Sequence, residues 1–190
     1  MTDLDAQSFL RGLDADPPLF EVRNGYLPSP MMARRKDGTV KDNFHLFETK
    51  AGGTQLRSET FAHYGALAEL VLDYGWPREA IVSEPHGPPG VTKGTVDLIV
   101  QRDEATVIAV EAKGPEKLLR RLIHGMNECS GAAERGHTKS DHNKCLGLLA
   151  FRSPLFLAAS CGPVRELYRV TSEERFVRLL AECDLSLIKA

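Results

Sequence analysis

The stretch that most constrains this chain is residues 94–114, GTVDLIVQRDEATVIAVEAKG. Two apolar runs typical of β-strands flank a charged turn near RDEA, so the stretch predicts a β-hairpin. Three charged residues, Asp97, Glu111 and Lys113, interrupt the apolar pattern. Because an uncompensated charge inside a sheet costs several kcal/mol, these positions require a physical explanation.

The length of the hairpin loop decides whether the two acids face each other. Side chains alternate along a strand, so Glu111 and Lys113 share one face. If the loop holds three or five residues, the numbers of paired residues add up to 208 and Asp97 lies opposite Glu111, with Cβ atoms about 5 Å apart. A regular four-residue loop changes the sum to 207 and sends the carboxylates to opposite faces. The predicted arrangement therefore needs the odd loop or a bulge.

Two carboxylates at this separation repel each other unless a proton or a cation lies between them. Hard oxygen ligands suit Mg²⁺ or Mn²⁺, which accept one or two carboxylates and keep several waters. Lys113 on the same face could orient or deprotonate an attacking water, or stabilise charge on a phosphate. These residues predict metal-assisted phosphodiester hydrolysis; ordinary salt bridges on a half-exposed sheet remain the alternative.

Composition places the chain among globular proteins. Its 190 residues, 42% hydrophobic and 26% charged, suit one domain or one domain with an extension. The net charge of −2 argues against a basic surface as a whole, so a nucleic-acid partner would need local patches. There is no CxxC pair, signal-peptide pattern or apolar run of about 20 residues. We expect a reduced, cytoplasmic protein with free thiols and no membrane segment.

Hydrophobic periodicity predicts the elements around the hairpin. Apolar residues at three- and four-residue steps predict a helix over residues 58–74, with Ser58 as its N-cap and Gly75 and Pro77 after its end. AIVSEP predicts a strand before the hairpin. A second amphipathic helix is expected to start at Pro115, because proline fits the first helical position.

Further along the chain, DHNKCLGLLAF is typical of a helix, and PLFLAAS and RELYRV are typical of strands. TSEERFVRLLAE predicts a final helix, with Thr171 and Glu174 at capping-box spacing. The order predicts an α/β domain over residues 56–190, with a mixed central sheet flanked by helices. Residues 1–55 have weak periodicity, with short strands around 20–22 and 43–47, and are expected to form an N-terminal extension packed on the core.

The predicted helix after Pro115 carries a basic stripe. Lys117, Arg120, Arg121 and His124 stand at i, i+3, i+4 and i+7. Next to the carboxylates, such a stripe could hold a nucleic-acid backbone. The alternative is the solvated face of an amphipathic helix.

The hairpin and its surroundings resemble the PD-(D/E)xK nuclease superfamily. GTVDLIV followed by VIAVEAKG supplies E-A-K for the (D/E)-x-K element, with Asp97 as the preceding acid. SETFAHYGALAELVLDYGWPREAIVSEP is similar to the first helix and first strand of that fold. The resemblance spans roughly residues 58–170, and the whole arrangement is similar to the nuclease domain at the N-terminus of type I restriction enzyme motor subunits.

The resemblance implies a restriction-endonuclease-like α-β-β-β-α-β core that cleaves DNA with Mg²⁺ or Mn²⁺. Asp97 and Glu111 would bind the metal, Lys113 would be catalytic, and Glu59 would match the additional acid of many members. The alternative for Glu59 is stabilisation of the helix start by the helix dipole. Glu84 is a weaker candidate, for which a surface strand end is the alternative.

The expected function is therefore a divalent-metal-dependent endonuclease of restriction or genome maintenance, acting on DNA rather than RNA. The alternative is a non-catalytic module on the same fold that binds nucleic acid or a partner protein, and a homodimer or a larger complex stays open.

The cysteines and histidines give weaker evidence for a functional site. The spacing of Cys129, His137, His142 and Cys145 fits no trusted zinc pattern, and nothing nearby in sequence activates Cys161 as a nucleophile.

Overall fold

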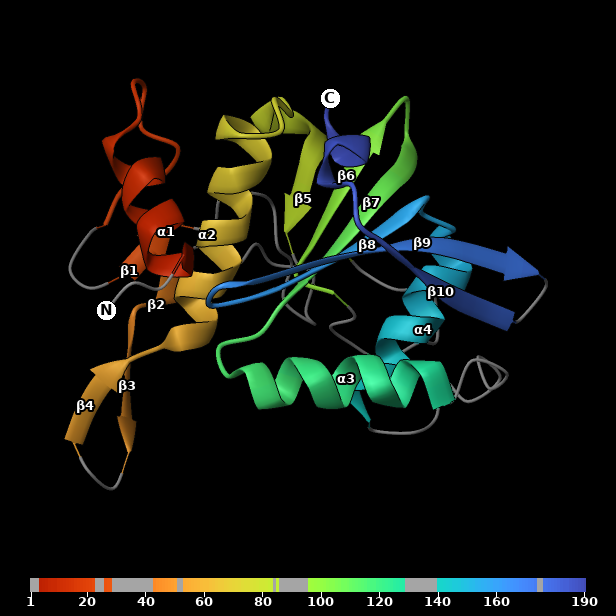
Figure 1. Cartoon of the computed structure of the whole chain (residues 1–190). Coiled ribbons are helices and arrows are strands. Elements are labelled where there is room, and N and C mark those ends of the chain that lie inside the picture. The colour runs from red at the N-terminus through yellow and green to blue at the C-terminus, as the bar shows by residue number, and fades with distance from the viewer. Residues whose placement is uncertain are drawn as a thin grey trace, which may run out of the picture.

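A mixed six-stranded sheet organises the chain, in the order β10-β9-β8-β7-β6-β5 (Figure 1). The computed structural model describes residues 4–22, 26–28, 43–50, 53–83, 85, 96–128, 140–173 and 176–190. Its helices are α1 (Leu4–Asp14), α2 (Ser58–Leu72), α3 (Glu116–Glu128) and α4 (Asp141–Arg152), with short 3₁₀ turns η1 (Arg78–Ala80) and η2 (Leu185–Ile188). The strands of the sheet are β5 (Ile81–Ser83), β6 (Leu98–Arg102), β7 (Ala105–Ala112), β8 (Phe156–Cys161), β9 (Val164–Glu173) and β10 (Phe176–Glu182).

Helices cover both faces of this sheet. Neighbouring strands are antiparallel except β7 and β8, which are parallel because α3 and α4 form the crossover between them. Val100 and Ile108 pack into a core with α1 and α2, whereas Ile99 and Ala109 pack into a second core with α3 and α4. This alternation confirms the predicted α/β class with a mixed sheet flanked by helices.

The β6–β7 hairpin contains an irregularity that changes its register. Its loop is the two residues Asp103 and Glu104, with φ of 50° and 66°, as tight hairpin turns require. Next to the loop, Gln101 pairs with Thr106, but beyond a bulge Val100 pairs with Ile108. The bulge shifts the sum of paired residue numbers from 207 to 208, which is the register that the predicted site requires.

The predicted final helix over residues 171–182 is wrong. The described residues of that segment are the end of β9 and the whole of β10, paired antiparallel with Leu179 opposite Val170. Val177 and Leu179 pack into the second core, while Arg178 and Leu180 are exposed. A period of two in the apolar residues therefore prevails over the capping-box spacing of Thr171 and Glu174.

The N-terminal segment contributes a helix that the sequence did not predict. α1 buries Asp5, Ser8, Phe9 and Gly12, a face of mainly polar and small residues that gives no apolar periodicity. Around it, Phe20 stacks on Phe9 with ring centroids 5.3 Å apart. No strand forms over residues 20–22, contrary to the prediction.

Short strands follow outside the main sheet. β1 (Tyr26–Pro28) pairs with β2 (Asn43–His45), and β3 (Phe47–Lys50) pairs with β4 (Gly53–Leu56) as a hairpin that projects from the body (Figure 1). The strand predicted around 43–47 corresponds to β2 and the start of β3. α2 then begins one residue earlier than expected, since Arg57 and not Ser58 occupies the N-cap position.

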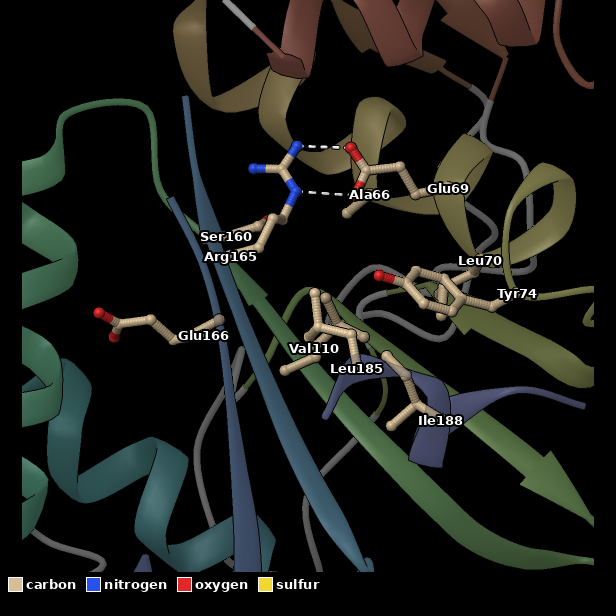
Figure 2. A pocket seen from close by; sticks show the side chains of 12 residues that line it. Ala66, Glu69, Leu70, Tyr74, Val110, Ser160, Arg165, Glu166, Leu185 and Ile188 are labelled. Atoms are coloured by element: carbon tan, nitrogen blue, oxygen red, sulfur yellow. Dashed lines mark hydrogen bonds and ion pairs between the residues drawn. The ribbon is translucent and has the colours of Figure 1, made fainter. Parts of the chain in front are cut away.

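An ion cluster ties the N-terminal helix to the sheet. Arg165 of β9 donates hydrogen bonds to Glu69 of α2 and to Asp5 of α1, which is 2.8 Å away (Figure 2 shows Arg165 and Glu69). Asp5 in turn accepts a 2.6 Å hydrogen bond from the Gly162 amide. The side chains of Arg165 and Asp5 are only 15% and 4% exposed.

Among the described helices, none is long and apolar enough to cross a membrane.

Candidate active site

The predicted catalytic residues lie at one end of the β6–β7 hairpin. Asp97 directly precedes β6, Glu111 is the second-last residue of β7, and Lys113 follows that strand. The pairing of β6 with β7 ends at Leu98 and Val110; just beyond it, the Asp97 amide donates a 3.0 Å hydrogen bond to the Val110 carbonyl, and the charge of Asp97 acts on Glu111. The Ala112 amide donates a 2.7 Å hydrogen bond to Asp97 Oδ2, which holds this carboxylate against β7.

Glu111 and Lys113 form a close ion pair. Lys113 Nζ lies 2.6 Å from Glu111 Oε1, and the two side chains are 15% and 6% exposed. Burial, and then the charge of Asp97, raise the pKa of Glu111 to about 8, although Lys113 opposes this rise. Burial alone would lower the pKa of Lys113, but the negative charges of Glu111 and Asp97 outweigh it and raise that pKa. Two acids thus compete for one ammonium group.

Asp97 is stabilised as an anion by different contacts. Burial favours its neutral form, but a hydrogen bond and charge from His63, the charge of Lys113 and the Ala112 amide together hold its pKa below the ordinary value. His63 Nδ1 lies 3.6 Å from Asp97 Oδ1, and its Nε2 lies 2.9 Å from Ser83 Oγ in β5. Sequence reasoning missed His63. Its position four residues after Glu59 on the same helix face was the available signal.

A polar cleft of about 290 Å³ opens beside these residues. Three of the predicted residues, Glu59, Lys113 and Arg121, line it. The opposite wall comes from the start of α4, where Ser140, Asp141 and His142 were not predicted as site residues. The charge of Asp141 adds to the rise in the pKa of both Glu111 and Lys113, so Asp141 acts electrostatically on the ion pair. In the sequence, the only indication of these three residues was the run SDH at the predicted start of a helix, after a polar stretch.

The predicted basic stripe of α3 divides between two surfaces. Arg121 faces the cleft, whereas Arg120 pairs with Glu166 on β9 and with Glu116 at 3.2 Å. His124 lies 3.3 Å from Glu128, and Lys117 is exposed. The structure therefore brings Arg121 next to the candidate catalytic residues and directs Arg120 towards the sheet.

Of the remaining candidates, His142 lines the cleft, and the two described cysteines are buried. Glu84, Cys129 and His137 lie outside the described residues. Cys145 is fully buried, and burial raises the pKa of its thiol well above the ordinary value. Cys161 is also buried, and its Sγ donates to the Gly114 carbonyl at 3.1 Å.

The donor chemistry of the acid pair fits a hydrated divalent cation. Asp97 and Glu111 supply two hard carboxylates, and each carboxylate retains lone pairs beyond its present contacts. Within the part of the chain that the structure describes, no group of three His, Cys, Asp or Glu residues is placed to hold a metal ion. Glu59 lines the cleft without joining such a group, so waters or substrate oxygens would complete the coordination.

Comparisons with protein-family models, with curated proteins and with solved structures found no match to this chain.

Proposed function

We propose that this chain is a Mg²⁺- or Mn²⁺-dependent nuclease of the PD-(D/E)xK kind that hydrolyses DNA phosphodiester bonds. The observation that carries the proposal is that Asp97, Glu111 and Lys113 gather at one end of the β6–β7 hairpin. The charge of Asp97 acts on Glu111, Lys113 Nζ lies 2.6 Å from Glu111 Oε1, and the cleft beside them also contains Arg121. The element order α2, β5, β6, β7, α3, α4 and β8 supports the proposal, because it contains the α-β-β-β-α-β order that the resemblance implies, with α4 as an additional helix before β8. An endonuclease of restriction or genome maintenance is the form of this activity that we favour.

Each residue has a distinct role in this proposal. Asp97, fixed by the Ala112 amide, and Glu111 would hold the cation. When bound, the cation would polarise a phosphate oxygen and lower the pKa of water. To bind it, Glu111 must exchange its contact with Lys113 for the ion. Lys113 is then free to orient the attacking water or to stabilise charge on the phosphate, and Arg121 can hold a phosphate by paired hydrogen bonds.

The test combines cleavage with metal binding. Duplex, single-stranded and branched DNA, and RNA, are incubated with Mg²⁺ or Mn²⁺ and with the native chain, Asp97→Asn or Lys113→Met. Asp97→Asn keeps an oxygen that accepts the Ala112 amide, so the fold should be preserved. We expect both changes to lower cleavage at least about 100-fold. Calorimetry should show Mn²⁺ binding lost in Asp97→Asn and kept in Lys113→Met.

Matched controls come from the same chain. Asp103→Asn makes the same change in the loop of the same hairpin, and Lys189→Met alters an exposed lysine near the C-terminus. Both should cleave like the native chain. Cleavage that survives Asp97→Asn and Lys113→Met would overturn the proposed site.

A non-catalytic module on the same fold is the second candidate. The contact of 2.6 Å between Lys113 and Glu111 favours it, because the lysine already neutralises one acid without a metal. In that case the protein would bind no Mn²⁺ and cleave nothing, but would still retain DNA through Arg121 and its neighbours.

A further inference from the structure

β10 forms one end of the main sheet and has an unusually regular outer edge. All seven of its residues pair with β9 without a register shift, and the strand contains no proline. Among the described residues, no strand pairs with the other side of β10, which lies at the margin of the molecule (Figure 1). Natural proteins usually blunt long edge strands with bulges, prolines or inward charges. β10 has none of these among its described residues.

The hydrogen bonds of β9 show which groups of β10 point outwards. Val170 directs its amide to the Leu155 carbonyl, on the side of β8, at 2.9 Å. Hydrogen-bonded and non-hydrogen-bonded pairs alternate along an antiparallel ladder. Leu179, which is opposite Val170, therefore turns its amide and carbonyl away from β9, as do Val177 and Ala181. These backbone groups form a template for one more strand.

The side chains of β10 are complementary to those of a second, antiparallel copy of the same strand. Arg178, Leu180 and Glu182 share one face, where Leu180 is 54% exposed and Glu182 lies 3.5 Å from Arg169. If a two-fold axis at Leu180 relates two antiparallel copies, Leu180 of one copy lies opposite Leu180 of the other. Arg178 of each copy then lies opposite Glu182 of the other. A shift of one residue would mix the two faces, and a shift of two would set Leu180 against a charge.

We propose that β10 is a self-association edge, on which two copies of the chain pair antiparallel about Leu180 and join their sheets into one. Leu179 and Ala181 of opposite copies exchange main-chain hydrogen bonds in this register, and the two Arg178–Glu182 contacts close its ends. The proposal is independent of the proposed nuclease activity, because β10 contributes no residue to the cleft.

Disulfide trapping tests the register. In a background with Cys129→Ser and Cys183→Ser, Leu180→Cys places two thiols across the two-fold axis. The Cα atoms would then be about 4.5 Å apart, within reach of a disulfide. Mild oxidation should give covalent dimers for Leu180→Cys and for the double variant Arg178→Cys/Glu182→Cys. Neither Arg178→Cys nor Glu182→Cys alone should cross-link, because those positions face each other and not themselves.

Charge exchange tests the contacts in solution. Sedimentation over a range of concentrations should show that Arg178→Glu and Glu182→Arg each weaken dimerisation at least about tenfold, and that the double exchange restores it. Arg78→Glu, an exposed arginine of η1, should leave dimerisation unchanged. Circular dichroism verifies that each variant is folded.

Three results would overturn the proposal. The first is a monomer at every concentration without Leu180→Cys cross-linking. The second is a dimer that responds to none of the exchanges, which would indicate another surface. The third is open-ended aggregation of the single-exchange variants that persists when Arg178→Glu and Glu182→Arg are combined.

Discussion

Replacement of Arg165 by methionine is expected to destabilise this fold more than replacement of any exposed charged residue. The guanidinium donates to Glu69 Oε2 at 2.7 Å (Figure 2). It also donates to Asp5 Oδ1 at 2.8 Å and to the carbonyls of Gly162 and Val164. It therefore links α1, α2 and the β8–β9 turn. Asp5 and Glu69 are 4% and 13% exposed, so neither acid can recover full hydration after the change.

The magnitude follows from the burial of the acids that remain. Removal of one partner of a buried ion pair costs about 3–5 kcal/mol, because the charge left behind has no compensation. For a domain of this size each kcal/mol lowers the Tm by about 2–4 °C, so Arg165→Met should lower the Tm by about 6–20 °C. The acids keep hydrogen bonds from the Gly162 amide and from Ser8 Oγ, both at 2.6 Å, and these limit the loss.

The assay is thermal and denaturant unfolding, with Arg11→Met as a matched control. Arg11 also links α1 to α2, through Asp73 at 2.6 Å, but the two side chains are 50% and 39% exposed. Such an exposed pair contributes about 0.2–1 kcal/mol to the free energy of unfolding. Adding Asp5→Asn and Glu69→Gln to Arg165→Met should recover part of the loss, since no buried charge then remains. Equal, small losses for Arg165→Met and Arg11→Met would refute the reasoning.

Three further outcomes are expected. Burial and the charge of Asp97 raise the pKa of Glu111 from 4.5 to about 8, so the folded state binds the extra proton between these pH values and loses stability as the pH rises through them. In metal-free buffer, the Tm of Glu111→Gln should therefore fall less than that of the native chain from pH 5 to pH 9; an equal fall would contradict this. A Cβ atom at Gly114 would overlap Ser58 Oγ and lie 2.7 Å from Ser58 Cβ, so Gly114→Ala should lower the Tm and Ser58→Gly should partly restore it. Finally, Arg121→Met should weaken DNA binding, measured with Ca²⁺ to block cleavage, and reduce the salt slope by about one, whereas Arg120→Met, tied to Glu166, should change neither.

The sequence predicted those elements whose apolar pattern is long and uniform. α2, the β6–β7 hairpin, α3 and α4 were all expected near their observed positions, because the apolar residues of each pack into a core. α1 escaped prediction because it packs through Asp5, Ser8 and Gly12 as well as Phe9. α2 also approaches α1 closely at Gly65, where a Cβ would lie 2.7 Å from the Asp5 carbonyl, so backbone proximity adds to the apolar contacts of Phe9.

The candidate site shows the same division. Asp97, Glu111 and Lys113 were accessible to sequence reasoning because charges inside apolar strands need a partner. Ser140, Asp141 and the rest of the far wall were not, because nothing in the sequence says that the start of α4 folds back over the end of β7. The contact between His63 and Asp97 likewise depends on how α2 crosses the sheet, which periodicity alone does not determine.

The position of Asp97 depends on two irregularities of its hairpin. A two-residue loop at Asp103 and Glu104 is followed by a bulge that leaves Val107 without a partner in β6 and moves every later pair by one residue. At the other end, the Asp97 amide donates to the Val110 carbonyl at 3.0 Å although Val110 pairs with Leu98, so the register changes again at Asp97. A Glu-x-Lys strand following an acid is therefore insufficient to form this site, because these irregularities, which contribute no side chain, help to set where the first acid lies relative to the second.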